Sequence, residues 1–242
     1  MTERRPDREN EGSPEPGLLH RRALLQRAAA LGLGTAAAYN LVADARPAVA
    51  QDDVTEWVVA LTEEPTGFDA AVQTFTFSNF MVEGHIFEPL VDIQGTDMVE
   101  VPALAESWEV LDDTTWQFNL RQGVTWHNGD PFTSADVVWT IERMMNEDGP
   151  RAYMTSQFES VEAPDDHTVI IKTKNPYGAM IAQLTDIVIL PRAAYEEMGA
   201  EAFTSAPIGT GPYRLSSWER GGTLVLEANP DWWRGSVTPD RL

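Results

Sequence analysis

Residues 120–143 read LRQGVTWHNGDPFTSADVVWTIER and join the end of a strand, a turn and the start of a helix without a gap. Just before them, Thr115 to Leu120 alternates polar and apolar side chains, which is the period of a half-buried strand. Residues 127–131, His-Asn-Gly-Asp-Pro, then predict a turn, because Asn-Gly tolerates positive φ and Pro131 cannot donate to a sheet ladder.

A helix is predicted to follow this turn. Thr133 is expected to be its N-cap, with Asp136 three residues later as an acidic variant of the capping box. Five apolar side chains recur at helical spacing and are predicted to face the core: Val137, Val138, Ile141, Met144 and Met145.

Outside this stretch, shorter signals alternate between strand and helix. The apolar run Trp57 to Leu61 predicts a buried strand, and Asn79 to Leu90 predicts a helix. Thr168 to Thr173 predicts another strand, and residues 213–217 and 223–228 flank Arg-Gly-Gly as the arms of a hairpin. Strands interspersed with helices indicate a mixed α/β class.

The composition limits the kind of protein this is. The chain has 242 residues, 43% of them hydrophobic, and eight tryptophans, which suits a globular fold. It has no cysteine, which excludes disulfides, thiolate metal sites and a lipidated N-terminal cysteine as an anchor.

Residues 1–50 have the features of a twin-arginine signal peptide. Arg21 and Arg22 precede an apolar run from Ala28 to Ala43, and Ala48-Val-Ala50 is a small-x-small cleavage site. The alternative is a membrane-anchoring helix, but the run is shorter than the roughly 20 apolar residues needed to cross a bilayer. We therefore expect export by the twin-arginine machinery and no stable membrane anchor after cleavage.

The chain is strongly acidic, with a formal net charge of −21. The leader holds 7 of the 17 basic and 6 of the 38 acidic residues, so the remainder carries 10 basic and 32 acidic groups, a net charge of −22. Such a surface repels nucleic acid and favours cationic or neutral ligands, so no nucleic-acid partner is expected. The alternative is a solvated acidic surface that only keeps the protein soluble.

The sequence offers no pattern for metal or catalytic chemistry. The histidines are His20, His85, His127 and His167, and none has metal-ligand spacing, so neither a metal nor a cofactor is expected. His127 is interpreted as a turn or packing residue and His85 as a partly exposed helix residue. Gly209-Thr-Gly-Pro212 is interpreted as a turn, because a strand pattern follows it where a phosphate-binding loop needs a helix.

Five motifs occur in the order found in one protein family. They are the 120–143 stretch, residues 67–70 (GFDA) with 86–90 (IFEPL), residues 101–108 (VPALAESW), residues 207–214 (PIGTGPYR) and residues 229–233 (NPDWW). Together they cover nearly all of residues 52–235. The chain resembles the family 5 solute-binding proteins of ABC importers, which receive peptides, nickel chelates and some oligosaccharides.

The resemblance implies a periplasmic-binding-protein-like fold of type II, class C style. The first part of a large lobe is expected at 51–90, a β-rich insert subdomain at 91–205, and the resumed large lobe at 206–242. The family's second lobe has no counterpart here, so the chain is expected to be an N-terminal half that binds peptides weakly, because a half-cleft cannot enclose a ligand.

The resemblance also implies a function without catalysis: capture of a peptide or other small solute outside the cytoplasm and its delivery to ABC permease subunits. The family's cleft is lined just after the motif at residues 67–70, where this chain has Thr74, Phe75, Thr76 and Phe77, and Tyr153 is a further candidate. An ordinary strand with Phe75 and Phe77 in the core is the alternative.

Trp232 and Trp233 are candidate ligand contacts, since aromatic side chains supply contact area at low entropic cost. Packing at a core edge is the alternative for this pair. For the whole protein, two other functions stay open: a truncated scaffold or sensor that does not transport, and a secreted hydrolase using carboxylates with His127 or His85.

Overall fold

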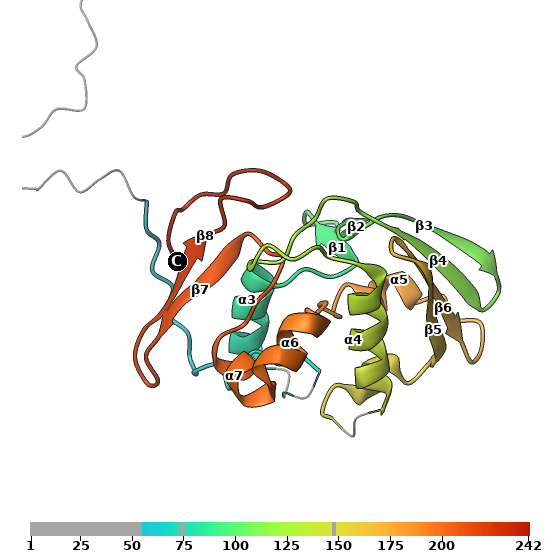
Figure 1. Cartoon of the computed structure of the whole chain (residues 1–242), viewed down its shortest axis with the longest axis horizontal. Coiled ribbons are helices and arrows are strands. Elements are labelled where there is room, and N and C mark those ends of the chain that lie inside the picture. The colour runs from blue at the N-terminus through green and yellow to red at the C-terminus, as the bar shows by residue number, and fades with distance from the viewer. Residues whose placement is uncertain (1–54, 72, 74–75, 147–148) are drawn as a thin grey trace, which may run out of the picture. The chain divides into compact units, whose positions relative to one another are not determined.

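The computed structural model describes residues 55–71, 73, 76–146 and 149–242, which belong to the unit Val54–Leu242. The predicted signal residues Arg21, Arg22, Ala48 and Ala50 lie outside the described residues, and so do Thr74 and Phe75. Helices and strands are labelled as in Figure 1.

Four antiparallel strands form the largest sheet, in the order β3-β4-β6-β5. Their bounds are Ala105–Asp112 for β3, Thr115–Leu120 for β4, Phe158–Asp165 for β5 and Thr168–Thr173 for β6. The predicted strands Thr115–Leu120 and Thr168–Thr173 are confirmed. They lie side by side with Phe118 opposite Val169. Because both side chains are fully buried, this register sets the inner face of the sheet.

Helix α4 (Ser134–Asn146) packs against β5 and β6 and begins where the sequence predicts. The Asp136 carboxylate accepts hydrogen bonds from the Thr133 N–H at 3.0 Å and from the Arg192 N–H at 3.0 Å. Asp136 therefore makes one half of the predicted capping box, since its own N–H donates to the Thr133 carbonyl at 3.1 Å and not to the Thr133 hydroxyl. It also ties the start of α4 to Arg192, where the helix Arg192–Met198 begins.

The first core lies between α4 and the sheet. Val137, Ile141 and Met144 are buried there, and Val138 and Met145 are partly buried against the same cluster, so the predicted face of the helix is confirmed. Figure 1 shows α4 standing between the four-stranded sheet and helices α6 (Arg192–Met198) and α7 (Ala200–Ser205).

The second core gathers residues from distant parts of the chain. It joins α3 (Phe77–Ile86), α6 and α7 with the hairpin of β7 (Tyr213–Trp218) and β8 (Leu224–Ala228). The predicted hairpin is confirmed, and the helix predicted from Asn79 is confirmed with an earlier start and an earlier end. The buried members of this second core are Phe68, Ala70, Val82, Ile86, Phe87, Leu190, Tyr195, Phe203, Tyr213 and Leu226.

The remaining elements are short. Strands β1 (Val91–Gln94) and β2 (Val99–Pro102) form a two-stranded sheet, η1 (Ala152–Thr155) is a 3-10 turn, and α5 (Met180–Leu184) contacts β1. Within the described part of the chain, no helix has the length and apolar character needed to cross a membrane.

The predicted buried strand at Trp57–Leu61 is wrong. Only Glu56 forms a bridge, with Arg241, and the side chain of Val58 is 90% exposed. Residues 57–60 are exposed, and Leu61 is partly buried against the second core. An apolar run is buried only where another surface covers it, and most of this run lacks such a surface among the described elements. The mixed α/β class is confirmed, whereas the bounds 51–90, 91–205 and 206–242 stay predictions.

Candidate functional site

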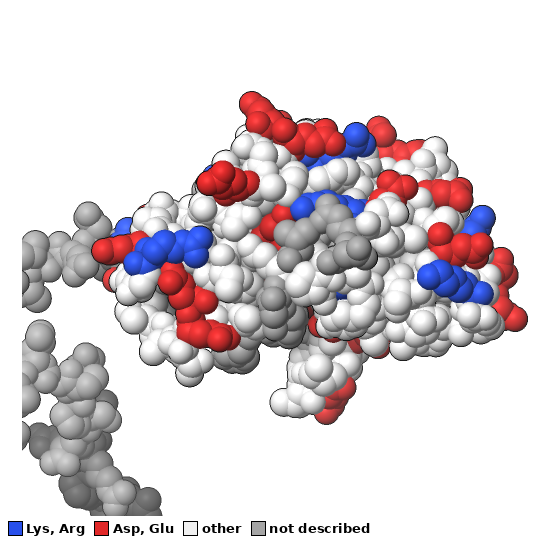
Figure 2. Space-filling model, turned by 90° about the horizontal axis from the view of Figure 1, so that it is seen from below, with Lys and Arg blue, Asp and Glu red and all other residues white. Residues whose placement is uncertain are grey.

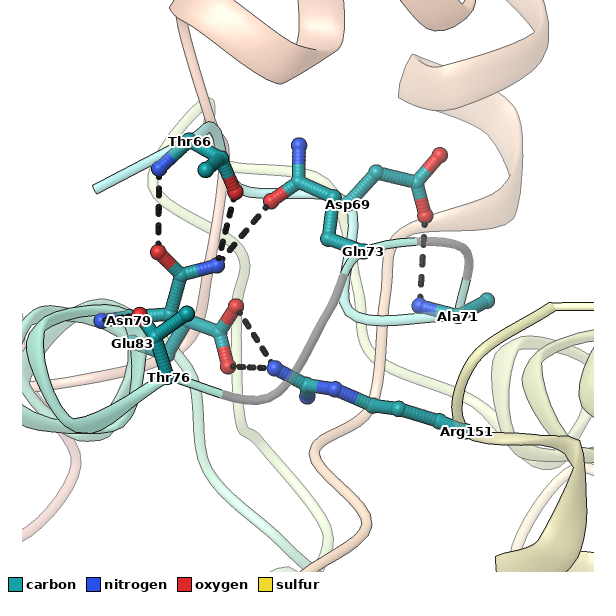
Figure 3. A network of polar contacts seen from close by, with 8 residues as sticks. All are labelled: Thr66, Asp69, Ala71, Gln73, Thr76, Asn79, Glu83 and Arg151. Atoms are coloured by element: carbon teal, nitrogen blue, oxygen red, sulfur yellow. Dashed lines mark hydrogen bonds and ion pairs between the residues drawn. The ribbon is translucent and has the colours of Figure 1, made fainter.

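The N-terminus of α3 carries a network of polar contacts, drawn in Figure 3. The Thr76 hydroxyl accepts the Asn79 N–H at 3.1 Å and is the N-cap of the helix. The Asn79 amide in turn accepts the Thr66 N–H at 3.0 Å and donates to the Thr66 hydroxyl at 3.2 Å and to Gln73 at 3.4 Å. Asn79 thereby holds residues on both sides of the helix start in one arrangement.

Of the predicted segment 74–77, Thr76 and Phe77 are described by the structure, and both lie at this helix start. Thr76 is half-buried as the N-cap, and Phe77 is the first residue of α3. The alternative of an ordinary strand is therefore wrong from Phe77 onward, because the cap turns the backbone into a helix there. Gln73 and Thr76 place neutral polar side chains beside Asn79, since Gln73 accepts from its side-chain amide and Thr76 accepts its backbone N–H.

A buried ion pair joins α3 to the turn that carries Tyr153. One guanidinium nitrogen of Arg151 donates to both carboxylate oxygens of Glu83, at 2.9 and 3.2 Å. Arg151 is 2% exposed and Glu83 is 3% exposed. Burial raises the pKa of Glu83 above its ordinary value, and the charge of Arg151 acts in the opposite direction.

Tyr153 lies on the turn that follows Arg151 and is held by the ion pair with Glu83. It lies in η1, where its neighbours Met154 and Thr155 are buried, yet its own side chain is 62% exposed. An exposed aromatic ring on a turn held by buried neighbours is a favourable contact for a ligand, because little conformational entropy is lost on binding.

A second ion pair anchors the loop before the site. Arg143, in the last turn of α4, donates to both oxygens of Asp69 at 3.0 and 2.7 Å, and the Tyr195 hydroxyl donates to Asp69 at 2.6 Å. Two open hollows of about 520 and 550 Å³ share Arg143 and Tyr195 in their walls. The loop is thus tied to α4 and α6 at the edge of a hollowed surface.

Trp232 and Trp233 lie elsewhere. Both indole N–H groups donate to the buried carboxylate of Glu88, at 3.3 and 2.7 Å. Burial raises the pKa of Glu88, and the hydrogen bond from Trp233 is the largest opposing influence. Glu88 follows the C-terminal end of α3, and ten residues of helix span about 15 Å, so the pair is not at the end where Thr76 lies.

The contacts of Trp233 are those of a packing residue. The guanidinium carbons of Arg121 and Arg234 lie 4.2 and 4.5 Å from the centroid of its ring, and the side chain packs against the first core. This is the alternative that the sequence offered for the tryptophan pair. A ligand contact by Trp232 or Trp233 stays a prediction.

His127 is a packing residue, as predicted. Its Nδ1 accepts the Gly209 N–H at 3.1 Å and its Nε2 donates to the Gly211 carbonyl at 3.0 Å. Burial lowers its pKa to about 4. His85 is partly buried, with Nδ1 2.6 Å from the Met81 carbonyl oxygen. The described residues contain no cluster of three or more potential metal ligands.

Several residues of the site were missed by sequence reasoning. Asp69, Asn79, Glu83 and Arg143 carry its two ion pairs and its polar network, but no local pattern distinguishes them from surface residues. Arg151 follows Gly149-Pro150 in the sequence, which predicts only a loop there and not the ion pair with Glu83. One signal was available for Asn79, because Thr76 precedes it at the spacing of a helix cap.

The chain is similar to proteins of one kind. Residues 100–242 match the model of "Bacterial extracellular solute-binding proteins, family 5 Middle". A putative ABC transporter peptide-binding protein of Brucella ovis is 35% identical over 165 residues, which are 64% of this chain and 31% of that protein. Di/tripeptide-binding protein 3 of Pseudomonas aeruginosa is 31% identical over 196 residues, 70% of this chain and 37% of that protein.

Solved structures agree with this similarity. The oligopeptide-binding protein AppA of Bacillus subtilis, in complex with a nonapeptide, aligns with a TM-score of 0.68 and 28% identity over 74% of this chain and 37% of AppA. NikZ of Campylobacter jejuni, in complex with Ni(L-His), aligns with a TM-score of 0.66 and 27% identity over 74% of this chain and 36% of NikZ. The chain thus spans about a third of the length of the proteins that it matches.

Proposed function

Because the chain belongs to the bacterial extracellular solute-binding proteins of family 5, we propose that it supplies one wall of the ligand site of a peptide receptor for an ABC importer. Curated relatives that are 31% and 35% identical are named as peptide-binding proteins, which supports peptides as the ligand class. The receptor would work outside the cytoplasm and hand its ligand to the permease subunits. No covalent step is part of this function.

The observation that carries the proposal is the placement of Tyr153. The Arg151–Glu83 ion pair joins the exposed ring of Tyr153 to the helix whose N-terminus carries Thr76 and Asn79. A peptide offers apolar side chains and a regular series of amide donors and acceptors. An exposed aromatic ring and neutral polar groups, carried on two elements that the ion pair joins, suit both parts of such a ligand.

The charges of this wall also suit a peptide main chain. Arg143 and Arg151 each face a carboxylate, Asp69 and Glu83, so neither guanidinium adds an uncompensated positive charge. On the face drawn in Figure 2, acidic side chains lie mostly toward the margins, and acidic and basic side chains also lie together near the centre. The wall is therefore proposed to contact neutral polar groups of the ligand.

The test is peptide binding by the protein expressed from its complete reading frame, with trialanine as the probe. Calorimetry should show binding of trialanine and no binding of the nickel–histidine chelate. Tyr153→Ala should weaken binding by about tenfold, because it removes an exposed aromatic contact. Leu111→Ala, at an exposed apolar position on β3, is the matched control and should bind as the unaltered protein does. Unchanged affinity in Tyr153→Ala would contradict the proposed wall.

The route of export is proposed from the leader alone. The paired Arg21 and Arg22 and the Ala48-Val-Ala50 cleavage site support the twin-arginine machinery as a partner. Replacing both arginines by lysine should leave the precursor inside the cell, detected by fractionation and blotting. Normal accumulation outside the cytoplasm would rule out this route.

A further inference from the structure

Glu83 and Arg151 form a buried ion pair, and a gain in stability alone does not explain why both charged groups are buried. Removing two charges from water costs several kcal/mol for each ion, and apolar residues of similar volume are often as stabilising. A buried pair does restrict the orientation of the segments that carry it, because the N–H groups of a planar guanidinium point in fixed directions and allow only a narrow range of carboxylate positions. Here one guanidinium nitrogen of Arg151 contacts both carboxylate oxygens of Glu83, at 2.9 and 3.2 Å, so a single donor group holds the whole carboxylate.

The two partners belong to segments that carry different parts of the candidate site. Glu83 lies four residues after Asn79 on α3, so both side chains are on one face of the helix, and Asn79 bonds Thr66 and Gln73. Arg151 is the residue immediately before η1, and its carbonyl accepts the Met154 N–H at 2.9 Å. The ion pair therefore links the residue that precedes η1, which carries Tyr153, to the body of α3, one turn beyond Asn79.

The second ion pair repeats the arrangement. Arg143 and Arg151 flank the end of α4 and the turn that follows it, while Asp69 and Glu83 flank the residues that lead into α3. Each arginine on one segment thus meets a carboxylate on the other. Two directional links restrict the relative rotation of the two segments more than one link does.

We propose that Glu83 and Arg151 are positioning residues that hold Tyr153 in register with the N-terminus of α3. The part of this inference that concerns ligand affinity rests on the proposed function; the positioning itself does not. The pair acts through Tyr153 and Asn79 and does not touch the ligand, since both charged groups are buried.

The test compares the double variant Glu83→Gln/Arg151→Gln with the unaltered protein. Replacing both partners avoids an isolated buried charge, so the unfolding midpoint should stay close to that of the unaltered protein. Amide hydrogen exchange without ligand is the first measurement. We expect exchange at Met154 and Ser156 to accelerate on the order of tenfold, because η1 loses its anchor.

Trialanine affinity, measured well below the unfolding midpoint, is the second measurement. It should fall by about tenfold, because the ring must then be ordered on binding. A residue that only stabilises the fold would not change this affinity. The control is Arg192→Gln/Glu196→Gln, which removes an exposed pair on α6 and should leave exchange and affinity unchanged.

The outcomes separate the two proposals. Unchanged exchange at Met154 and Ser156 would overturn the positioning role whether or not peptide binds. Faster exchange with unchanged trialanine affinity would overturn its link to ligand binding. If the unaltered protein binds no trialanine, the proposed function fails, and the exchange result still decides on positioning. Should the double variant not fold, Arg151→Lys keeps the charge, and faster exchange in it supports the same conclusion.

Discussion

His127 joins two turns that lie far apart in the sequence. Its backbone N–H donates to the Gly209 carbonyl at 2.8 Å, its Nδ1 accepts the Gly209 N–H, and its Nε2 donates to the Gly211 carbonyl. Only the neutral imidazole with its proton on Nε2 can make both ring contacts, since a charged ring has no acceptor. A histidine held in this way is not available as a general base, so the His127 version of the hydrolase hypothesis loses its support.

This residue predicts a pH dependence of stability. The pKa of His127 is about 4 in the folded protein and 6.5 in its ordinary state, so the unfolded chain binds a proton first as the pH falls. Its contribution is present above pH 6.5 and is lost between pH 6.5 and about 4. The lost free energy of unfolding should be on the order of 3 kcal/mol.

Denaturant unfolding across this pH range, in the unaltered protein and in His127→Gln, measures the effect. The difference in unfolding free energy between the two proteins should shrink as the pH falls, because only the unaltered protein loses the contribution of His127. The other buried carboxyl groups contribute equally to both proteins and cancel in this difference. A difference that stays constant over the whole range would refute the assignment.

At the scale of elements, the 209–211 turn packs closely on the end of α3. The Gly211 N–H donates to the Ile86 carbonyl at 2.9 Å and so satisfies one of the last carbonyls of the helix. A Cβ added at Gly209 would lie 1.8 Å from the Ile86 carbonyl oxygen. The glycines are therefore required by close approach of two backbones.

Gly209→Ala should destabilise the protein by about 3 kcal/mol or more, because a backbone oxygen cannot move aside as a flexible side chain can. Thermal or denaturant unfolding gives the value. Gly178→Ala is the matched control, since nothing lies within 4 Å of its added Cβ, and it should unfold nearly as the unaltered protein does. Equal stability of the two variants would show that the turn does not need glycine.

Local patterns explain how well the elements were predicted. Strand β4 and helix α4 were found because alternation, turn residues and the Asp136 cap act over a few neighbouring residues. The prediction for Trp57–Leu61 is wrong because its apolar run has the composition of a strand, but among the described residues only Leu61 of this run packs against a core. The composition of a segment shows which secondary structures it can adopt, whereas the surface that packs against it determines whether it is buried.

At the scale of the whole molecule, negative charge dominates. Residues 51–242 hold 32 acidic against 10 basic residues, so like charges repel across the folded surface. Raising NaCl from about 20 to about 500 mM should screen this repulsion and raise the unfolding temperature by several degrees. Calorimetry at neutral pH measures the rise.

The same salt series near pH 4 is the control. Many carboxylates are protonated there, so the rise in unfolding temperature should become smaller. If the unfolding temperature at neutral pH does not change or falls as the NaCl concentration rises, the acidic residues are too dispersed to destabilise the fold.

The sequence by itself determined the mixed α/β class, the family, and the strand, turn and helix of residues 115–146. These follow from side chains that act on their own backbone and on near neighbours. Only the tertiary structure decided which charged groups pair. Glu83 meets Arg151 across 68 positions and Asp69 meets Arg143 across 74, while Trp233 meets Glu88 across 145. A partner at such a separation is chosen by the packing of whole elements, and no local pattern in the sequence records that choice.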